Sequence, residues 1–378
     1  MQLIFTALKF MKFDKPKSIG ALFGVIISIF LIGQQTGIFI FLTNAMCYLV
    51  RVNDTYIWVT DNKTTNVNAL APIDVRLGNE MESLPHIEKA YELVIASGAA
   101  RFSDGTSAGL SMVGSELPDF AGLPKDALIE GNLNDLIPEG AFSVDFFDGK
   151  ALGNPSKGDY FEINGKQVYI AAKTKGARGF GGGLFSFTTK ERARFIGNVP
   201  VTKTSAFLIK VDQPQRMRSV VNSINATIPG VKAWMPKDFK NETILTVLKS
   251  SGIAFSFGTL IIFALISGFV IIGLTLYSAA IDRIKDYGTL KAIGATNRFI
   301  RRLILMQAII YALIGFILGY ALIEGFRNGI ANAGTLFTFP PAAKVAFFII
   351  TALISISGTL FAIRRIAKLE PASVFRST

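Results

Sequence analysis

Four long stretches of the sequence are apolar and contain no Lys, Arg, Asp or Glu. They are residues 18–50, 250–281, 303–323 and 345–363. A membrane-spanning helix needs about 20 apolar residues, so the third and fourth stretches each match one crossing. The first two are about ten residues longer, and we expect their helices to continue out of the lipid as stalks. A tilted helix, or one that ends early, would also accommodate the extra length.

The spacing of these stretches predicts one span, a large intervening domain and then three spans. Three of the short segments that adjoin the predicted spans are rich in basic residues. They are Lys9, Lys12, Lys15, Lys17, Arg283, Lys285, Lys291, Arg298, Arg301, Arg302, Arg364, Arg365, Lys368 and Arg376. The link 324–344 carries only Arg327 and Lys344. By the positive-inside rule both termini are cytoplasmic and the large domain is extracytoplasmic, as in a multi-pass protein of the cell inner (plasma) membrane.

The net charge of +12 reflects this positive-inside bias in part. The basic residues lie beside apolar helices, where anionic lipid headgroups are the default partners. Since no basic–aromatic motif for nucleic acid is present, we expect membrane lipids as partners and no nucleic acid.

The segment 51–240 predicts a mixed α/β domain. Four of its runs are rich in β-branched or aromatic residues and alternate in polarity. They are residues 55–60, 107–113, 159–171 and 205–211. Asn164-Gly165 interrupts the third run and is a strong hairpin signal. Residues 214–228 have helical spacing, with Met217, Val220, Val221 and Ile224 on one face.

The polar residues of this domain form no recognisable catalytic set. His86 is the only histidine, which excludes a Ser-His-Asp triad or a multi-histidine metal site within one chain. The glycine-dense loop 176–183 lacks the Gly-Lys-Ser/Thr ending of a phosphate-binding loop. We interpret it as a flexible hairpin tip, or alternatively as a mobile loop that touches a partner or substrate. The chain is therefore expected to be no enzyme and to hold neither a metal nor a cofactor.

Polar and small residues within the apolar stretches indicate helix packing. Gln34 and Gln35 lie inside the first stretch, where hydrogen bonds between helices are favoured over contact with a substrate. Gly315 and Gly319 form a small-xxx-small pair for close approach of two helices. Residues 2–13 are amphipathic and are expected to lie along the cytoplasmic interface, or to be an ordinary flank of the first span.

The link between the second and third spans predicts a short helix at the membrane face. We expect the second helix to run to Asp286 and Gly288 to supply a left-handed helix stop. Residues 289–293 then form a short amphipathic turn that ends at Gly294. Thr296 or Asn297 caps the third helix. Such a helix suits docking into a groove of a soluble partner.

With these residues the chain resembles the FtsX/MacB-like family of ABC-transporter permeases, the type VII mechanotransmission class. The family motif is a basic residue, an acidic residue, a Gly and a run like LKAIGAT. Here these are Arg283, Asp286, Gly288 and residues 290–296. The tail RRIAKLEPA at 364–372 and the arrangement of one span plus three are similar too. The sequence departs from the family at Asp286, where Glu is more usual, and at Gln307, where an acidic residue is frequent.

The resemblance implies that residues 282–302 are a cytoplasmic coupling segment. The residues implied to couple to the ATPase are Asp282, Arg283, Asp286, Tyr287, Gly288, Leu290, Lys291, Ala292, Gly294 and Thr296. Family permeases are homodimers that work with two copies of a cognate cytoplasmic ABC ATPase. The sequence has no Walker motif, so the partner ATPase would bind ATP-Mg. A periplasmic adaptor and an outer-membrane channel are further implied partners.

The predicted fold class is an α-helical membrane protein with four transmembrane helices (1+3) and an extracytoplasmic mixed α/β domain between helices 1 and 2. In chain order the expected parts are the cytoplasmic N-terminus 1–17, span and stalk 18–50, the MacB-like domain 51–240, stalk and span 241–281, the coupling segment 282–302, span 303–323, the external link 324–344, span 345–363 and the cytoplasmic tail 364–378.

The function implied by the resemblance is the permease subunit of an ATP-driven ABC exporter. ATPase motion would pass through the stalks to the outer domain and extrude a hydrophobic or amphiphilic cargo. Length and the glutamines of the first span are similar to the DevC-like branch. The alternatives are an FtsX-like regulator of a cell-wall hydrolase, whose outer domain is usually smaller, and an extruder of haem or drugs without an adaptor.

Overall fold

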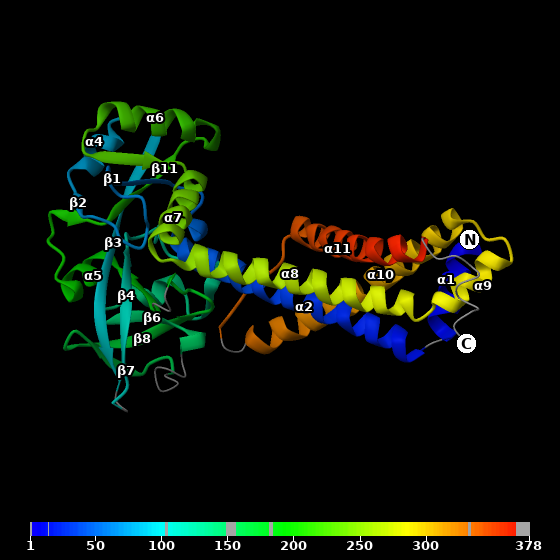
Figure 1. Ribbon diagram of the computed structural model, residues 1–378. Coiled ribbons are helices and arrows are strands. Elements are labelled where there is room, and N and C mark those ends of the chain that lie inside the picture. Colours follow the sequence, from blue (N-terminus) through cyan, green and yellow to red (C-terminus); the bar gives the residue numbers. More distant parts are fainter. Residues whose placement is uncertain are drawn as a thin grey trace. The chain divides into compact units, whose positions relative to one another are not determined.

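The computed structural model describes residues 2–13, 15–102, 105–148, 156–180, 184–331 and 334–367. The chain divides into a helical unit, Met1–Ile40, Phe255–Ala331 and Thr335–Thr378, and an α/β unit, Phe41–Ala254 with Asn332–Gly334 (Figure 1). The end of the predicted tail, residues 368–378, and the loop residues 181–183 lie outside the described residues.

The helical unit is built from long helices whose apolar residues surround the helix axis, as expected for membrane spans. Its helices are α1 (Gln2–Phe13), most of α2 (Lys15–Met46), α8 (Ile253–Ile281), α9 (Ile284–Ala292), α10 (Asn297–Ala331) and α11 (Pro341–Ala367). Ser18–Met46 and Asn297–Ala331 are each long and apolar enough to cross a membrane. Pro236–Ser250 and Phe255–Ile271 qualify as a third span when taken together, and Pro341–Ser357 is a shorter apolar helix. The protein is thus a helical membrane protein with two to three spans among the described residues, and the fourth crossing stays a prediction.

Glycines on α10 bring this helix against α2. A Cβ atom added at Gly319 would lie 2.9 Å from Cγ2 of Ile29, and one at Gly315 would lie 3.0 Å from Cβ of Val25. The structure therefore places the predicted small-residue pair where the two helices approach closely. Gln34 and Gln35 are half-buried on α2, and their hydrogen bonds between helices stay a prediction.

The α/β unit is organised around one long strand. Its strands are β1 (Ile57–Asp61), β2 (Ile73–Asp74), β3 (Ile87–Arg101), β4 (Ser107–Ser115), β5 (Leu128–Glu130), β6 (Ala141–Asp145), β7 (Tyr160–Ile163), β8 (Lys166–Thr174), β9 (Leu184–Thr189), β10 (Lys203–Thr204), β11 (Ala206–Val211) and β12 (Val231–Trp234). The main sheet has the order β12-β1-β11-β3-β7-β8-β5. The first half of β3 pairs with β11, and its second half pairs with β4 and β7. Strand β4 also pairs with β9 in parallel, and β6 pairs with β8 in parallel.

Helices cover this sheet and close its cores. They are α3 (Tyr48–Val52), α4 (Leu77–Glu82), α5 (Lys190–Gly197), α6 (Met217–Thr227) and α7 (Pro236–Ser250). The predicted apolar face of α6 packs into a core with β1, β11 and β12. Asn164 and Gly165 both have positive φ, 51° and 74°, and connect β7 to β8. A mixed α/β domain between the first span and the later helices confirms the predicted fold class.

Candidate functional site

The segment between α8 and α10 differs from its predicted outline. Helix α8 ends at Ile281, and α9 runs from Ile284 to Ala292. Gly288 is a buried residue within α9 rather than a left-handed stop, so this prediction is wrong. Tertiary packing explains the difference, because the fully buried neighbour Tyr287 fastens this turn of α9 against other helices.

The end of α9 has the hydrogen bonds of a Schellman motif. Gly294 has a φ of +106°, and its N–H donates to the carbonyl oxygen of Lys291 at 3.0 Å. The N–H of Ala295 donates to the carbonyl oxygen of Leu290 at 2.9 Å. This pair of bonds satisfies helix-end carbonyls and requires a positive φ at the stop residue. Helix α10 begins at Asn297, after Thr296, whose Oγ1 accepts a hydrogen bond from the N–H of Phe299 at 3.3 Å.

The inner face of α9 is fixed by Tyr287. Its ring is fully buried and stacks on Phe10 of α1, with ring centroids 5.9 Å apart and planes at 10°. Its hydroxyl donates to Oε1 of Gln307 on α10 at 3.3 Å. Burial raises the pKa of Tyr287 to about 12, so the phenol stays a neutral donor at physiological pH. One side chain therefore joins α1, α9 and α10.

A buried cation completes this inner face. Arg283, just before α9, is 6% exposed, and its Nη2 donates to Oγ of Ser18 on α2 at 3.3 Å. Its guanidinium lies 6.0 Å from the centroid of the Phe10 ring, at the outer limit of a cation–π contact. The Oγ of Ser18 also donates to the carbonyl oxygen of Met11 at 2.7 Å, so Arg283 ties the start of α9 to the junction of α1 and α2.

The outer face of α9 is open to solvent. Asp282, Asp286, Ala292, Gly294 and Thr296 are exposed, whereas Leu290 and Lys291 are half-buried. Ile293 at the end of α9 is 79% exposed. The surrounding exposed residues are charged, and they include Lys285, Arg298, Arg301 and Arg302. Ile293 is thus an exposed apolar side chain in a segment whose other exposed side chains are mainly charged.

The predicted site residues thus separate into an inner set that holds α9 and an outer set that faces solvent. Sequence reasoning did not assign Phe10 or Ser18 to the site. The available signal was the three-residue spacing of Ala7 and Phe10, which places both on one helical face. Gln307 is buried and neutral, and it contacts the site through Tyr287.

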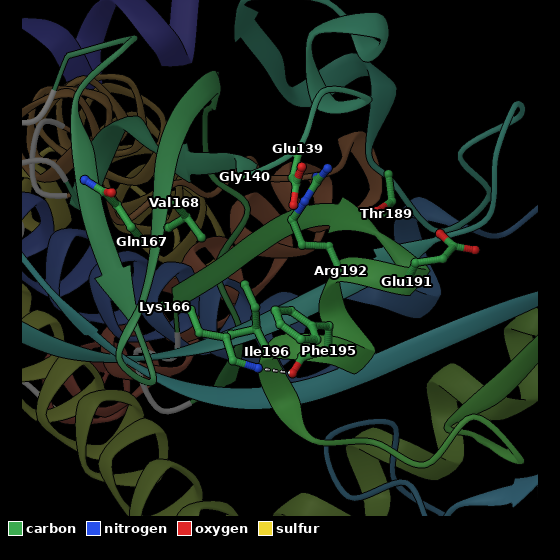
Figure 2. A pocket seen from close by; sticks show the side chains of 10 residues that line it. All are labelled: Glu139, Gly140, Lys166, Gln167, Val168, Thr189, Glu191, Arg192, Phe195 and Ile196. Carbon is green, nitrogen blue, oxygen red and sulfur yellow. Dashed lines mark hydrogen bonds between the residues drawn. The ribbon is translucent and has the colours of Figure 1, made fainter.

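A second candidate is a cavity of about 310 Å³ in the α/β unit. Its walls come from the loop before β6, from β8 and from α5. The lining residues are Glu139, Gly140, Lys166, Gln167, Val168, Thr189, Glu191, Arg192, Phe195 and Ile196 (Figure 2). Arg192 donates to the main-chain oxygens of Leu136, Ile137, Pro138 and Ala141. Because this cation is committed to carbonyls and the other charges have both signs, the cavity defines no ligand class.

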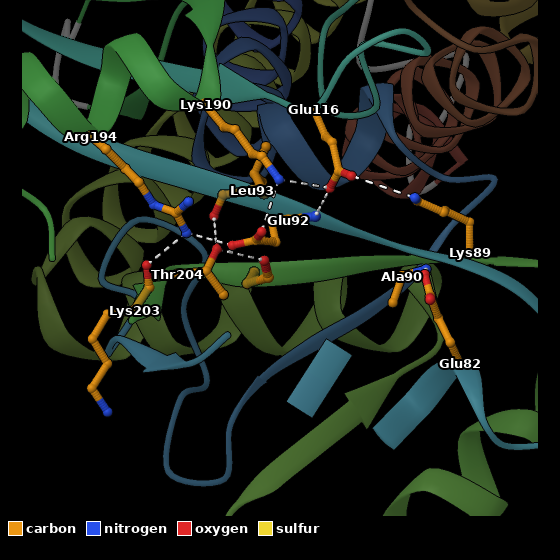
Figure 3. Close-up of polar contacts among 11 residues, drawn as sticks. Glu82, Lys89, Ala90, Glu92, Leu93, Glu116, Lys190, Arg194, Lys203 and Thr204 are labelled. Carbon is orange, nitrogen blue, oxygen red and sulfur yellow. Dashed lines mark hydrogen bonds and ion pairs between the residues drawn. The ribbon is translucent and has the colours of Figure 1, made fainter. Parts of the chain in front are cut away.

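Ion pairs beside this cavity fasten α5 to the sheet. Glu92 of β3 accepts from Lys190 at 2.9 Å and from Arg194 (Figure 3). Lys190 also pairs with Glu116 at 3.4 Å, and Glu116 with Lys89 at 3.6 Å. The charges are mutually paired and mostly shielded, which indicates a structural role.

The glycine-dense loop is anchored where the structure describes it. Asp145 is 2% exposed and accepts hydrogen bonds from the N–H of Ala177 at 2.8 Å and of Phe147 at 3.1 Å. Burial raises the pKa of Asp145 despite these bonds. The start of the loop is therefore held by a carboxylate.

Comparisons with known proteins identify the class of the helical unit. Residues 258–371 match the family described as FtsX-like permease C-terminal. This range includes α9, α10 and α11 in full and most of α8. The C-terminal part of the chain is therefore an FtsX-like permease domain. The resemblance that the sequence motif indicated is thereby confirmed.

No curated protein sequence is significantly similar to this chain. Two solved domains are similar to about half of this chain at 10% sequence identity. The extracellular domain of the noncanonic ABC-type transporter YknZ from Gram-positive bacteria aligns over 48% of this chain and 98% of its own, with a TM-score of 0.35. The periplasmic region of MacB from Actinobacillus actinomycetemcomitans aligns over 51% and 94%, with a TM-score of 0.38. Likenesses at this level do not transfer a function.

Proposed function

We propose that this permease is the membrane subunit of an ATP-driven ABC exporter and that α9 is the helix on which its ATPase acts. The observation that carries the proposal is the division of α9 into two faces. Its inner face is fastened to α1, α2 and α10 through Tyr287 and Arg283. Its outer face presents exposed Ile293 among charged residues. Because interiors are close-packed, a push on the outer face moves the attached helices with α9.

The proposed partner is a cognate cytoplasmic ABC ATPase, present in two copies on a permease homodimer. Its nucleotide-binding sites would hold ATP-Mg, so ATP hydrolysis is assigned to the partner and not to this chain. The charges around Ile293 set the orientation of docking, since electrostatic complementarity fixes register more than affinity. Asp282 and Asp286 contribute negative charges to a rim that is otherwise basic.

The proposed location is the cell inner membrane, with both termini cytoplasmic and the α/β unit extracytoplasmic. The support is the basic residues of α1, α9 and the first turns of α10, which belong on the cytoplasmic side. In a two-membrane cell the extracytoplasmic unit would meet a periplasmic adaptor and an outer-membrane channel. The cargo class is hydrophobic or amphiphilic.

Mechanotransmission is the proposed mode of action. Helix α2 is continuous over 32 residues, about 48 Å at 1.5 Å per residue, which exceeds a hydrocarbon core of about 30 Å. The second stalk is interrupted instead, because α7 ends at Ser250, α8 begins at Ile253 and Gly252 between them has a φ of +66°. In this proposal α2 is a rigid strut and Gly252 is a hinge. An FtsX-like regulator of a cell-wall hydrolase and an extruder of haem or drugs without an adaptor remain the alternatives.

The test compares ATPase stimulation by variants of α9. We expect Asp286→Ala and Gly288→Leu to lower stimulation of the co-purified ATPase at least several-fold, the first by removing a docking charge and the second by displacing the buried face. Membrane levels of the permease should stay normal. Lys63→Ala, which removes an exposed charge of the α/β unit, is the control. Wild-type stimulation in both α9 variants would contradict the assignment.

A further inference from the structure

Helix α1 has two faces with different surroundings. One face packs inside the helical unit, where Ala7 is fully buried and Phe10 stacks on Tyr287. The other face exposes large apolar side chains. These are Ile4, Phe5 and Leu8, with exposed fractions of 44%, 62% and 43%, and Phe13 at the end of the helix with 91%. At about 100° per residue, Ile4, Leu8 and Phe5 share one stripe.

The charges beside this stripe identify what covers it. Lys9 and Lys12 are exposed. At the same angle per residue, Lys12 continues the stripe one turn after Leu8, and Lys9 lies at its edge. The sequence of α1, QLIFTALKFMKF, contains no acidic residue. Helix α1 leads after one residue into α2, which is apolar enough to span a membrane from Ser18 onward. An apolar stripe with lysines at this position fits a bilayer surface rich in anionic headgroups.

The buried face of the same helix contacts the start and the middle of α9. Phe10 lies between the Tyr287 ring, at 5.9 Å, and the Arg283 guanidinium, at 6.0 Å. Arg283 also reaches the α1–α2 junction through Ser18. A shift of α1 at the membrane surface therefore changes the packing around both inner-face residues of α9.

We propose that α1 is a lipid-surface sensor. When anionic headgroups bind α1, it holds α9 in the position in which α9 couples to the ATPase. This proposal rests on the assignment of α9 as the ATPase-coupling helix. The bilayer contact is carried by Lys9, Lys12 and the apolar stripe, and Phe10 transmits it to α9. The expected consequence is that ATPase stimulation depends on anionic lipid.

The experiment uses the full chain in vesicles of phosphatidylcholine, with or without phosphatidylglycerol. The lipid contact is read without the ATPase, by an environment-sensitive dye on Phe5→Cys in a Cys47→Ser background. We expect a blue shift in anionic vesicles that high salt reduces, because salt screens exposed charges. Combining Lys9→Gln and Lys12→Gln should abolish the shift, since each lysine changes the interfacial population about fivefold.

The functional arm adds the co-purified ATPase to the same vesicles. Anionic lipid should raise stimulation in the wild type and in the Lys63→Gln control, but not in the double lysine variant. Phe10→Ala should keep the dye shift and lose the lipid dependence of stimulation, a split that mere misfolding does not produce. An equal dye signal in both vesicle types, or unchanged lipid dependence in the lysine variant, would overturn the proposal. Absent stimulation in every lipid with the dye shift intact would overturn the coupling role of α9 instead.

Discussion

Gly294 shows how one residue sets the geometry of the docking face. At a φ of +106° a side chain is strained even though the space around the residue is open. The bend that it makes aims Ile293 into solvent and starts α10 three residues later. The LKAIGAT motif thus contains its own helix stop.

Replacing Gly294 by Ala should weaken this stop. We expect a cost of about 1–3 kcal/mol from the positive φ, which lowers the melting temperature in detergent and reduces ATPase stimulation. The control is Gly258→Ala in α8, where the backbone is helical and the Cβ meets open space. Ala is favoured over Gly inside a helix, so the control should be neutral or stabilising. Equal effects at both positions would contradict the assigned strain.

Arg192 stabilises the α/β unit through its hydrogen bonds to the main chain. Replacing it by Met keeps much of the volume but removes the donor to four carbonyl oxygens. We expect the free energy of unfolding to fall by about 1–3 kcal/mol, because the carbonyl oxygens of the buried residues Leu136 and Ala141 lose a charged donor. Trp58 and Trp234, the two tryptophans of the chain, lie in this unit, so their fluorescence during urea unfolding reports on it. The control is Arg218→Met, which breaks an exposed ion pair with Asp238 and should cost under about 1 kcal/mol. An equal loss of stability in the two variants would contradict the structural role assigned to Arg192.

At the scale of elements, the apolar stretches and the hairpin signal predicted much of the fold. Local signals were sufficient for α2, α10, α6 and the Asn164-Gly165 turn, since each depends on periodicity or on one residue's φ. The break at Gly252 and the helical conformation of Gly288 were not predictable, because a glycine is compatible with either state and tertiary packing decides. The parallel pairs β4–β9 and β6–β8 join strands with no local pairing signal.

In the candidate site, too, local signals predicted some features, and tertiary packing determined the others. The motif identified the residues of α9 as a set, but the inner and outer faces depend on Phe10 and Ser18, more than 260 residues earlier in the chain. No spacing within the motif contains that information. The closeness of α10 to α2, by contrast, was predictable in kind from the Gly315–Gly319 pair, although the partner helix was not.

The glycines of α10 allow a position-matched test of this packing. Gly319→Leu should displace α10 from α2, since even a Cβ there lies 2.9 Å from Ile29. We expect a loss of about 1–3 kcal/mol from overpacking, seen as a lower melting temperature of the full chain in detergent. Gly325→Leu on the same helix meets open space and should have little effect. A comparable loss from both substitutions would argue against close packing at Gly319.

At the scale of the whole molecule, we assign force input to α9 and lipid contact to α1 and the spans. The first assignment requires that a soluble ATPase binds the outer face of α9, and the most direct evidence would be a covalent link from that face. A photo-crosslinking amino acid at Ile293, in native membranes, followed by mass spectrometry of the product provides it. We expect a crosslink to an ABC ATPase subunit and none from the same probe at Lys63. Products that lack an ATPase, or that contain it equally from both positions, would contradict the assignment of α9 as the coupling helix.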